Sequence, residues 1–154
     1  LGDLEGAYEA LRIAVALSKD NSTKEMYAHN SLGVAYRAGG RFDEAVTEHR
    51  TALELADRNG NRSADAEVLT DLGATYSAAG RHAEAARTLE KALAMAHERG
   101  ERYVAARASL ALGGLPAPVV DAERARGLLT DALRTFEDLG LPDADRAREA
   151  LKDF

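Results

Sequence analysis

The sequence contains no cysteine, so it has neither a disulfide framework nor a thiolate for catalysis or metal binding. It has no run of about eighteen apolar residues and no recognisable signal peptide, so we predict no membrane span. Acidic residues outnumber basic ones, and the formal net charge is −6. Binding to phosphate needs clustered Lys and Arg, so we expect no direct contact with nucleic acid. Together these absences favour a cytoplasmic protein.

The sequence does contain ample apolar material, since 45% of its 154 residues are hydrophobic and 30% are charged. This composition argues against a disordered chain and provides enough apolar surface for a core. The length suits one globular domain of ordinary size or a short array of repeats. The internal pattern of the sequence decides between them.

One stretch of the sequence is written twice, forty residues apart: residues 32–60 resemble residues 72–100. A fixed period of about 20–50 residues indicates a solenoid, in which each unit buries its apolar face on its neighbours. Twelve of the twenty-nine positions are identical, namely Leu32/Leu72, Gly33/Gly73, Tyr36/Tyr76, Ala38/Ala78, Gly40/Gly80, Arg41/Arg81, Glu44/Glu84, Ala45/Ala85, Ala52/Ala92, Leu53/Leu93, Ala56/Ala96 and Gly60/Gly100.

Apolar residues at helical spacing predict about eight helices, and the short connections make consecutive helices antiparallel. The predicted helices cover residues 3–19, 23–38, 43–59, 63–79, 83–99, a stretch cut short at Gly114, 121–138 and 143–153. The residues 22–25 read as a capping box that begins the second helix. Gly39 and Gly40 end it, because glycine takes the left-handed conformation without steric cost.

The repeat divides the chain into units within a single domain. We predict unit one at residues 23–62, unit two at 63–102, a degenerate unit three at 103–140 and a terminal helix at 141–154. Residues 1–22 align with the second half of a unit, so their helix lacks the first helix that would pair with it. We therefore expect the chain to be a fragment of a larger protein, with a polar last unit that closes the end of the array against water.

The repeated residues resemble the signature of the tetratricopeptide repeat (TPR) family. By this resemblance the chain is all-α, a right-handed α-solenoid of antiparallel helix pairs that mediates protein–protein interaction. The glycines let two helices of a unit approach closely, the alanines keep the facing surface small, and the tyrosines fill the space between units. The signature residues are Leu32, Gly33, Tyr36, Ala45, Ala52, Leu72, Gly73, Tyr76, Ala85, Ala92, Leu112, Gly113, Ala125 and Ala132.

The chain departs from the usual family pattern in three respects. Its units are forty residues long instead of about thirty-four. Such long units resemble those of kinesin light chains and of actinobacterial multidomain transcriptional regulators with a signalling ATPase. His29 and His49 replace packing aromatics, and we expect them to pack in the core near each other. Pro116 stands where a third tyrosine would be expected.

No constellation of residues predicts an enzyme. The four histidines form no pair with metal-ligand spacing, and His82 and His97 read as surface residues. The carboxylates lie mainly at predicted helix starts, where the helix dipole accounts for them. We therefore expect no catalytic residue, no metal and no cofactor.

A binding surface remains. In a TPR array the first helices of the units line the concave side, and their free faces form a candidate groove of mixed charge for a protein or peptide. The groove lacks the Lys and Asn cluster with which chaperone partners hold a C-terminal carboxylate. The candidate groove residues are Tyr27, Asn30, Val34, Arg37, Glu67, Thr70, Ala74, Ser77 and Arg107.

The resemblance thus implies the interaction or sensor region of a larger cytosolic regulatory protein. The partner is a separate protein or peptide, or another segment of the parent chain. Two alternatives stay open: a regulator that senses a peptide or small molecule in a closed pocket, and a scaffold that self-associates through the apolar face of the helix at residues 3–19.

Overall fold

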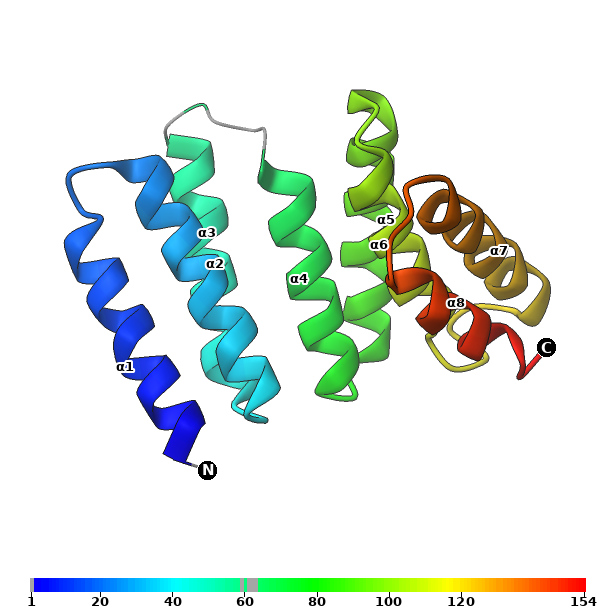
Figure 1. The fold of residues 1–154 in the computed structure, drawn as a ribbon, viewed down its shortest axis with the longest axis horizontal. Coiled ribbons are helices and arrows are strands. Elements are labelled where there is room, and N and C mark those ends of the chain that lie inside the picture. The colour runs from blue at the N-terminus through cyan, green and yellow to red at the C-terminus, as the bar shows by residue number, and fades with distance from the viewer. Residues whose placement is uncertain (1, 59, 61–63) are drawn as a thin grey trace.

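The computed structural model describes residues 2–58, 60 and 64–154, and within these residues the chain forms eight α-helices and no strand (Figure 1). The all-α solenoid of helix pairs is therefore confirmed. None of the described helices is long and apolar enough to cross a membrane. The helices are α1 (Gly2–Leu17), α2 (Ser22–Ala38), α3 (Phe42–Arg58), α4 (Asp65–Ala78), α5 (His82–Arg99), α6 (Arg102–Gly113), α7 (Ala122–Asp138) and α8 (Asp143–Leu151).

The helix ends lie within two residues of the predicted ones wherever the structure describes them. Residues 59 and 63, predicted as helix ends, lie outside the described residues. The predicted capping box at residues 22–25 is wrong, because Ser22 is already the first helical residue. The N-cap is Asn21, which has extended backbone angles and accepts a hydrogen bond from the Lys24 amide at 3.0 Å.

The two helices of each pair touch at a glycine, which explains why this residue recurs. A Cβ atom at the glycine of α2, α4 or α6 would lie only 2.5–2.9 Å from a buried side chain of the next helix. Any larger residue would therefore force the pair apart. The three contacts are Gly33 on His49, Gly73 on Leu89, and Gly113 on Leu129.

Small residues continue this close packing along the second helix of each pair. The six signature alanines of α3, α5 and α7, two on each helix, are buried almost completely, so there is no room for longer side chains at these positions. They are Ala45, Ala52, Ala85, Ala92, Ala125 and Ala132.

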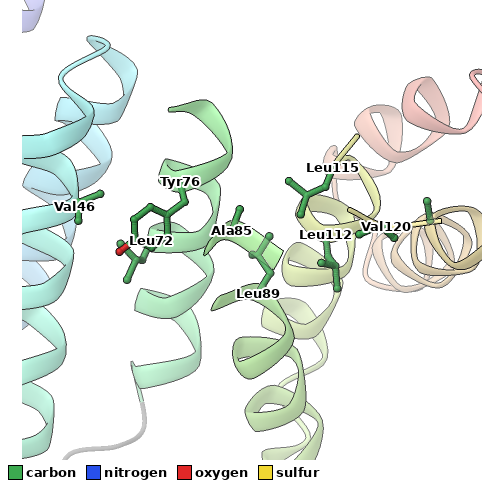
Figure 2. Packing of buried hydrophobic residues seen from close by; sticks show 9 residues of the cluster. Val46, Leu72, Tyr76, Ala85, Leu89, Leu112, Leu115 and Val120 are labelled. Carbon is green, nitrogen blue, oxygen red and sulfur yellow. The ribbon is translucent and has the colours of Figure 1, made fainter. Parts of the chain in front are cut away.

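Two tyrosines join neighbouring pairs, as predicted. Tyr36 packs against Tyr8 of α1, and Tyr76 packs in a cluster with Val46 of α3 (Figure 2). Each phenol oxygen accepts a hydrogen bond from an arginine of the preceding second helix. Nε of Arg12 lies 3.1 Å from Tyr36, and Nη2 of Arg50 lies 2.9 Å from Tyr76. The joint between pairs is thus repeated together with the sequence.

The third pair fills the place of the missing tyrosine differently. Pro116 is exposed, and Leu115 and Val120 from the loop after α6 enter the core instead, where they pack with Leu112 (Figure 2). The degenerate repeat therefore remains closed without its aromatic residue.

The array curves toward the first helices of its pairs. Along the array α2 contacts α4, and α4 contacts α6, whereas the second helices contact mainly the helices next to them in sequence. The first helices therefore lie on the tighter, inner side. At the C-terminal end α8 packs on α7 (Figure 1).

The glycine contact can be tested with two glycine-to-alanine changes of opposite effect. Gly73→Ala should lower the free energy of unfolding by about 1–3 kcal/mol, because its methyl group would overlap the fully buried Leu89. Gly127→Ala should raise it by up to about 1 kcal/mol, since Gly127 of α7 has open space around it and alanine favours the helix. Urea denaturation followed by circular dichroism measures both. Equal shifts of one sign would refute the close approach.

Candidate functional site

A carboxylate lies buried in the middle of α4. The Asp71 side chain is only 4% exposed. Its Oδ2 accepts a hydrogen bond from Nδ2 of Asn30 at 2.9 Å, and its Oδ1 accepts one from Nη2 of Arg107 at 2.6 Å. Nη1 of Arg37 donates to the Asp71 carbonyl at 3.1 Å and lies 3.9 Å from Oδ1. One acid thus joins α2, α4 and α6, the three inner helices.

His49 extends this network into α3. An ionised carboxylate can only accept hydrogen bonds, so the Asn30 amide nitrogen faces Asp71 and its oxygen faces His49. Nδ1 of His49 therefore carries a hydrogen and donates it to that oxygen at 2.8 Å. Nε2 faces the hydroxyl of Thr75 at 3.1 Å. We call these linked side chains (Asn30, His49, Asp71, Thr75 and Arg107) the Asp71 network.

Burial controls the charge of the histidine. It lowers the pKa of His49 from 6.5 to about 4, because the charged imidazolium would lose its hydration. The carboxylate of Asp71 opposes this effect, and the cation of Arg37 adds to it. His49 is therefore neutral at pH 7, which fits its role as donor to Asn30 through one nitrogen.

Two cavities of about 430 and 480 Å³ open on the inner side of the array, and residues of the Asp71 network line them. Arg37, Arg107, Asp143 and Arg146 line both cavities, which therefore adjoin. We call the two together the concave groove. One end is walled mainly by small or apolar residues: Ala74, Ala78, Leu110, Ala111, Gly114 and Ala150. The other end is polar, with Asn30, Ser31, Glu67, Asp71 and Tyr103.

Eight of the nine predicted groove residues line the concave groove. The ninth, Tyr27, is exposed but lines neither cavity. Two of the eight differ from the solvent-facing positions that were expected. Asn30 and Thr70 are buried, because Asn30 bonds to Asp71 and His49, and the Thr70 hydroxyl donates to the Ala66 carbonyl at 2.7 Å. The remaining six are Val34, Arg37, Glu67, Ala74, Ser77 and Arg107.

Sequence reasoning missed three charged residues of the groove. Asp71 is the one charge in the apolar middle of α4, a signal that could have found it. Asp143 and Arg146 were missed because α8 was expected only to close the end of the array. The helix does pack Ala144 and Ala147 into the core, but its other side contributes to the groove wall.

The histidines are placed partly as predicted. His29 and His49 both lie at the interface of α2 and α3, where Nδ1 of His29 is 2.6 Å from Glu48. The prediction of a surface position is wrong for His82, which is half-buried, and its Nδ1 has no hydrogen-bond partner among the described residues. Within the same residues no group of three or more His, Asp or Glu side chains could hold a metal ion.

A comparison with known protein families gives a match that covers helices of this groove. Residues 24–98 match the tetratricopeptide repeat family. The matched TPR segment runs from α2 to α5 and includes the first copy of the repeat and all but the last two residues of the second. TPR arrays generally mediate protein–protein interaction and are a non-catalytic fold. No curated protein matches the chain. The narrower likeness to kinesin light chains and actinobacterial regulators stays a prediction.

The Asp71 network predicts how stability depends on pH. The unfolded histidine takes up a proton near pH 6.5, whereas folded His49 does so only near pH 4. Acidification between these values therefore favours the unfolded state, by at most about 3 kcal/mol for a shift of this size. Denaturation midpoints measured between pH 7 and 4.5 should fall accordingly. The variant His49→Leu carries the leucine that the other two pairs have at this position. It should flatten the dependence of stability on pH. The exposed His97→Gln serves as control, and an equally flat profile for that variant would contradict the assignment.

Proposed function

We propose that the concave groove binds an extended or helical segment of a partner protein. The observation that carries this proposal is that two adjoining cavities follow the inner helices α2, α4 and α6 and end at α8. A ligand that filled both would contact side chains from all three helix pairs. TPR arrays in general use such inner surfaces for binding partner proteins.

The Asp71 network supports this proposal, because it fixes the groove before a ligand arrives. Arg107 is held by Asp71 at 2.6 Å, and Arg37 is held by the Asp71 carbonyl. Both side chains are only 24% exposed, so little of their rotamer freedom is left to lose on binding. Preorganisation of this kind raises affinity by lowering the entropic cost of association.

We place this module in a larger regulatory protein of the cytosol, as its resemblance to long-repeat regulators suggests. In that setting the groove ligand is either a separate protein or another segment of the parent chain. The charges of the groove suit a polypeptide with both polar and apolar side chains, since one end of the groove is polar and the other is not.

Filling the groove should abolish binding without unfolding the array. Ala74 of α4 is half-buried in the apolar cavity, so Ala74→Trp should occupy that space. We expect peptides selected from a random library on the purified chain to bind this variant at least about tenfold more weakly. Ala94→Trp on the exposed side of α5 is the matched control and should bind normally. Fluorescence anisotropy measures both affinities. Equal binding by the two variants would exclude the groove.

A second candidate function is self-association through α1. Helix α1 aligns with α3, the second helix of the first full pair. In α3 one face packs against α2, and the equivalent face of α1 is covered by no helix among the described residues. Leu17 is 79% exposed, whereas its counterpart Leu55 is 7% exposed. We propose that a second copy of the chain covers this face. The corresponding positions are Ala7 and Ala45, Leu11 and His49, Ala14 and Ala52, Leu17 and Leu55, and Ser18 and Ala56.

The α1 face is tested by placing a charge on it. Leu17→Asp should convert a dimer to a monomer, because a buried, unpaired carboxylate at the interface would cost several kcal/mol. Leu17 is exposed in the single chain, so the fold should be preserved. Ala16→Asp is the control, since its counterpart Glu54 is exposed in α3. Sedimentation equilibrium gives the mass. A wild-type monomer, or a dimer that survives Leu17→Asp, would refute this candidate.

A further inference from the structure

We propose that the concave groove recognises an acidic side chain of its peptide ligand, and that Arg37 binds this carboxylate. The inference deepens the proposed function and rests on it, because it names the chemistry of the ligand at one point of the groove.

Arg37 occupies the junction of the two cavities and lines both. It lies in the last turn of α2, and Asp143 and Arg146 of α8 line the same two cavities. A peptide that extends through the groove must therefore pass this guanidinium. The Arg37 side chain is 24% exposed to solvent, so a ligand can reach it without moving the inner helices.

Most of the donors of Arg37 are unused. Within the described chain its one hydrogen bond runs from Nη1 to the Asp71 carbonyl. No bond from Nε or Nη2 to another described residue accompanies it. A guanidinium offers five N–H donors in a planar fork that matches the two oxygens of a carboxylate. The unused part of the fork is therefore a ready site for an anion.

The charge of Arg37 is also incompletely balanced. Asp71 is the acid nearest to it, but both oxygens of that carboxylate already accept closer bonds, from Arg107 and Asn30. Burial lowers the pKa of Arg37, and the cations of Arg107 and Arg146 lower it further, against the attraction of Asp71. A ligand carboxylate at this point would relieve the repulsion among the three arginines.

The other two acids of the groove form ion pairs with other arginines. Glu67 lies 3.8 Å from Arg107, and Asp143 lies 3.6 Å from Arg146. On one side of Arg37 the groove is apolar, with walls such as Ala74, Leu110 and Ala111. We therefore expect the preferred ligand to carry Asp or Glu close to an aliphatic residue. The acid would lie on Arg37, and the aliphatic side chain in the apolar cavity.

The test begins with selection of random linear peptides on the purified wild-type chain and on Arg37→Gln. Wild-type selections should be enriched in Asp and Glu, and the enrichment should disappear with the variant. Arg126→Gln, an exposed arginine of α7, is the control and should select as the wild type does. Thermal unfolding shows that each variant is folded. If Arg37→Gln is not, Arg37→Lys replaces it, since it keeps the charge but not the planar fork.

One selected peptide is then synthesised in two forms, as selected and with its Asp or Glu changed to Asn or Gln. The affinities of both peptides for wild type and for Arg37→Gln form a double-mutant cycle. Removing the acid should weaken binding to wild type by roughly tenfold and leave binding to Arg37→Gln unchanged. If the selected peptides bind Ala74→Trp more weakly than wild type, but show neither a preference for acids nor coupling to Arg37, this inference is overturned. The proposal that the groove binds a peptide would then still stand. No selected peptide, or peptides indifferent to Ala74→Trp, would overturn the proposed function and this inference with it.

Discussion

The structure depends on a close contact within each helix pair, in which a glycine of the first helix rests on a buried side chain of the second. Gly33, Gly73 and Gly113 bring their helices so near that even a methyl group would collide. The consequence extends beyond the pair. Because the partners are close, the tyrosines at the end of the first helix reach the preceding second helix and accept a hydrogen bond from its arginine. The inner helices α2, α4 and α6 are thereby aligned along one side.

The candidate site is built where the sequence departs from its own repeat. Asp71 stands at the position that Ser31 and Ala111 hold in the other units, and His49 stands where the later units have leucine. Identical positions give a regular scaffold, and that scaffold brings the unique polar residues together across three helices. The carboxylate of Asp71 is buried and accepts hydrogen bonds at both oxygens. It in turn holds Arg37 and Arg107 at the surface of the groove.

The sequence predicted the fold well, because a forty-residue period of glycine, alanine and tyrosine determines which helix faces must meet. Eight of the nine positions chosen from the sequence line the two cavities, and their role in binding a partner stays a prediction. Periodicity says nothing, however, about contacts between residues that do not repeat. The pairing of Asn30 with Asp71, and the approach of Arg146 from α8, depend on distances across helices that share no sequence pattern. The buried state of Asn30 was missed for this reason.

The Asp71 network also bears on how the array comes apart. In a solenoid whose units touch only their neighbours, units can open one after another from either end. Here one side chain receives hydrogen bonds from Asn30 of the first pair and Arg107 of the third. A boundary between folded and unfolded units on either side of α4 would deprive a buried charge of one of its donors. We therefore expect this next-nearest coupling to favour joint unfolding of the three pairs over opening unit by unit.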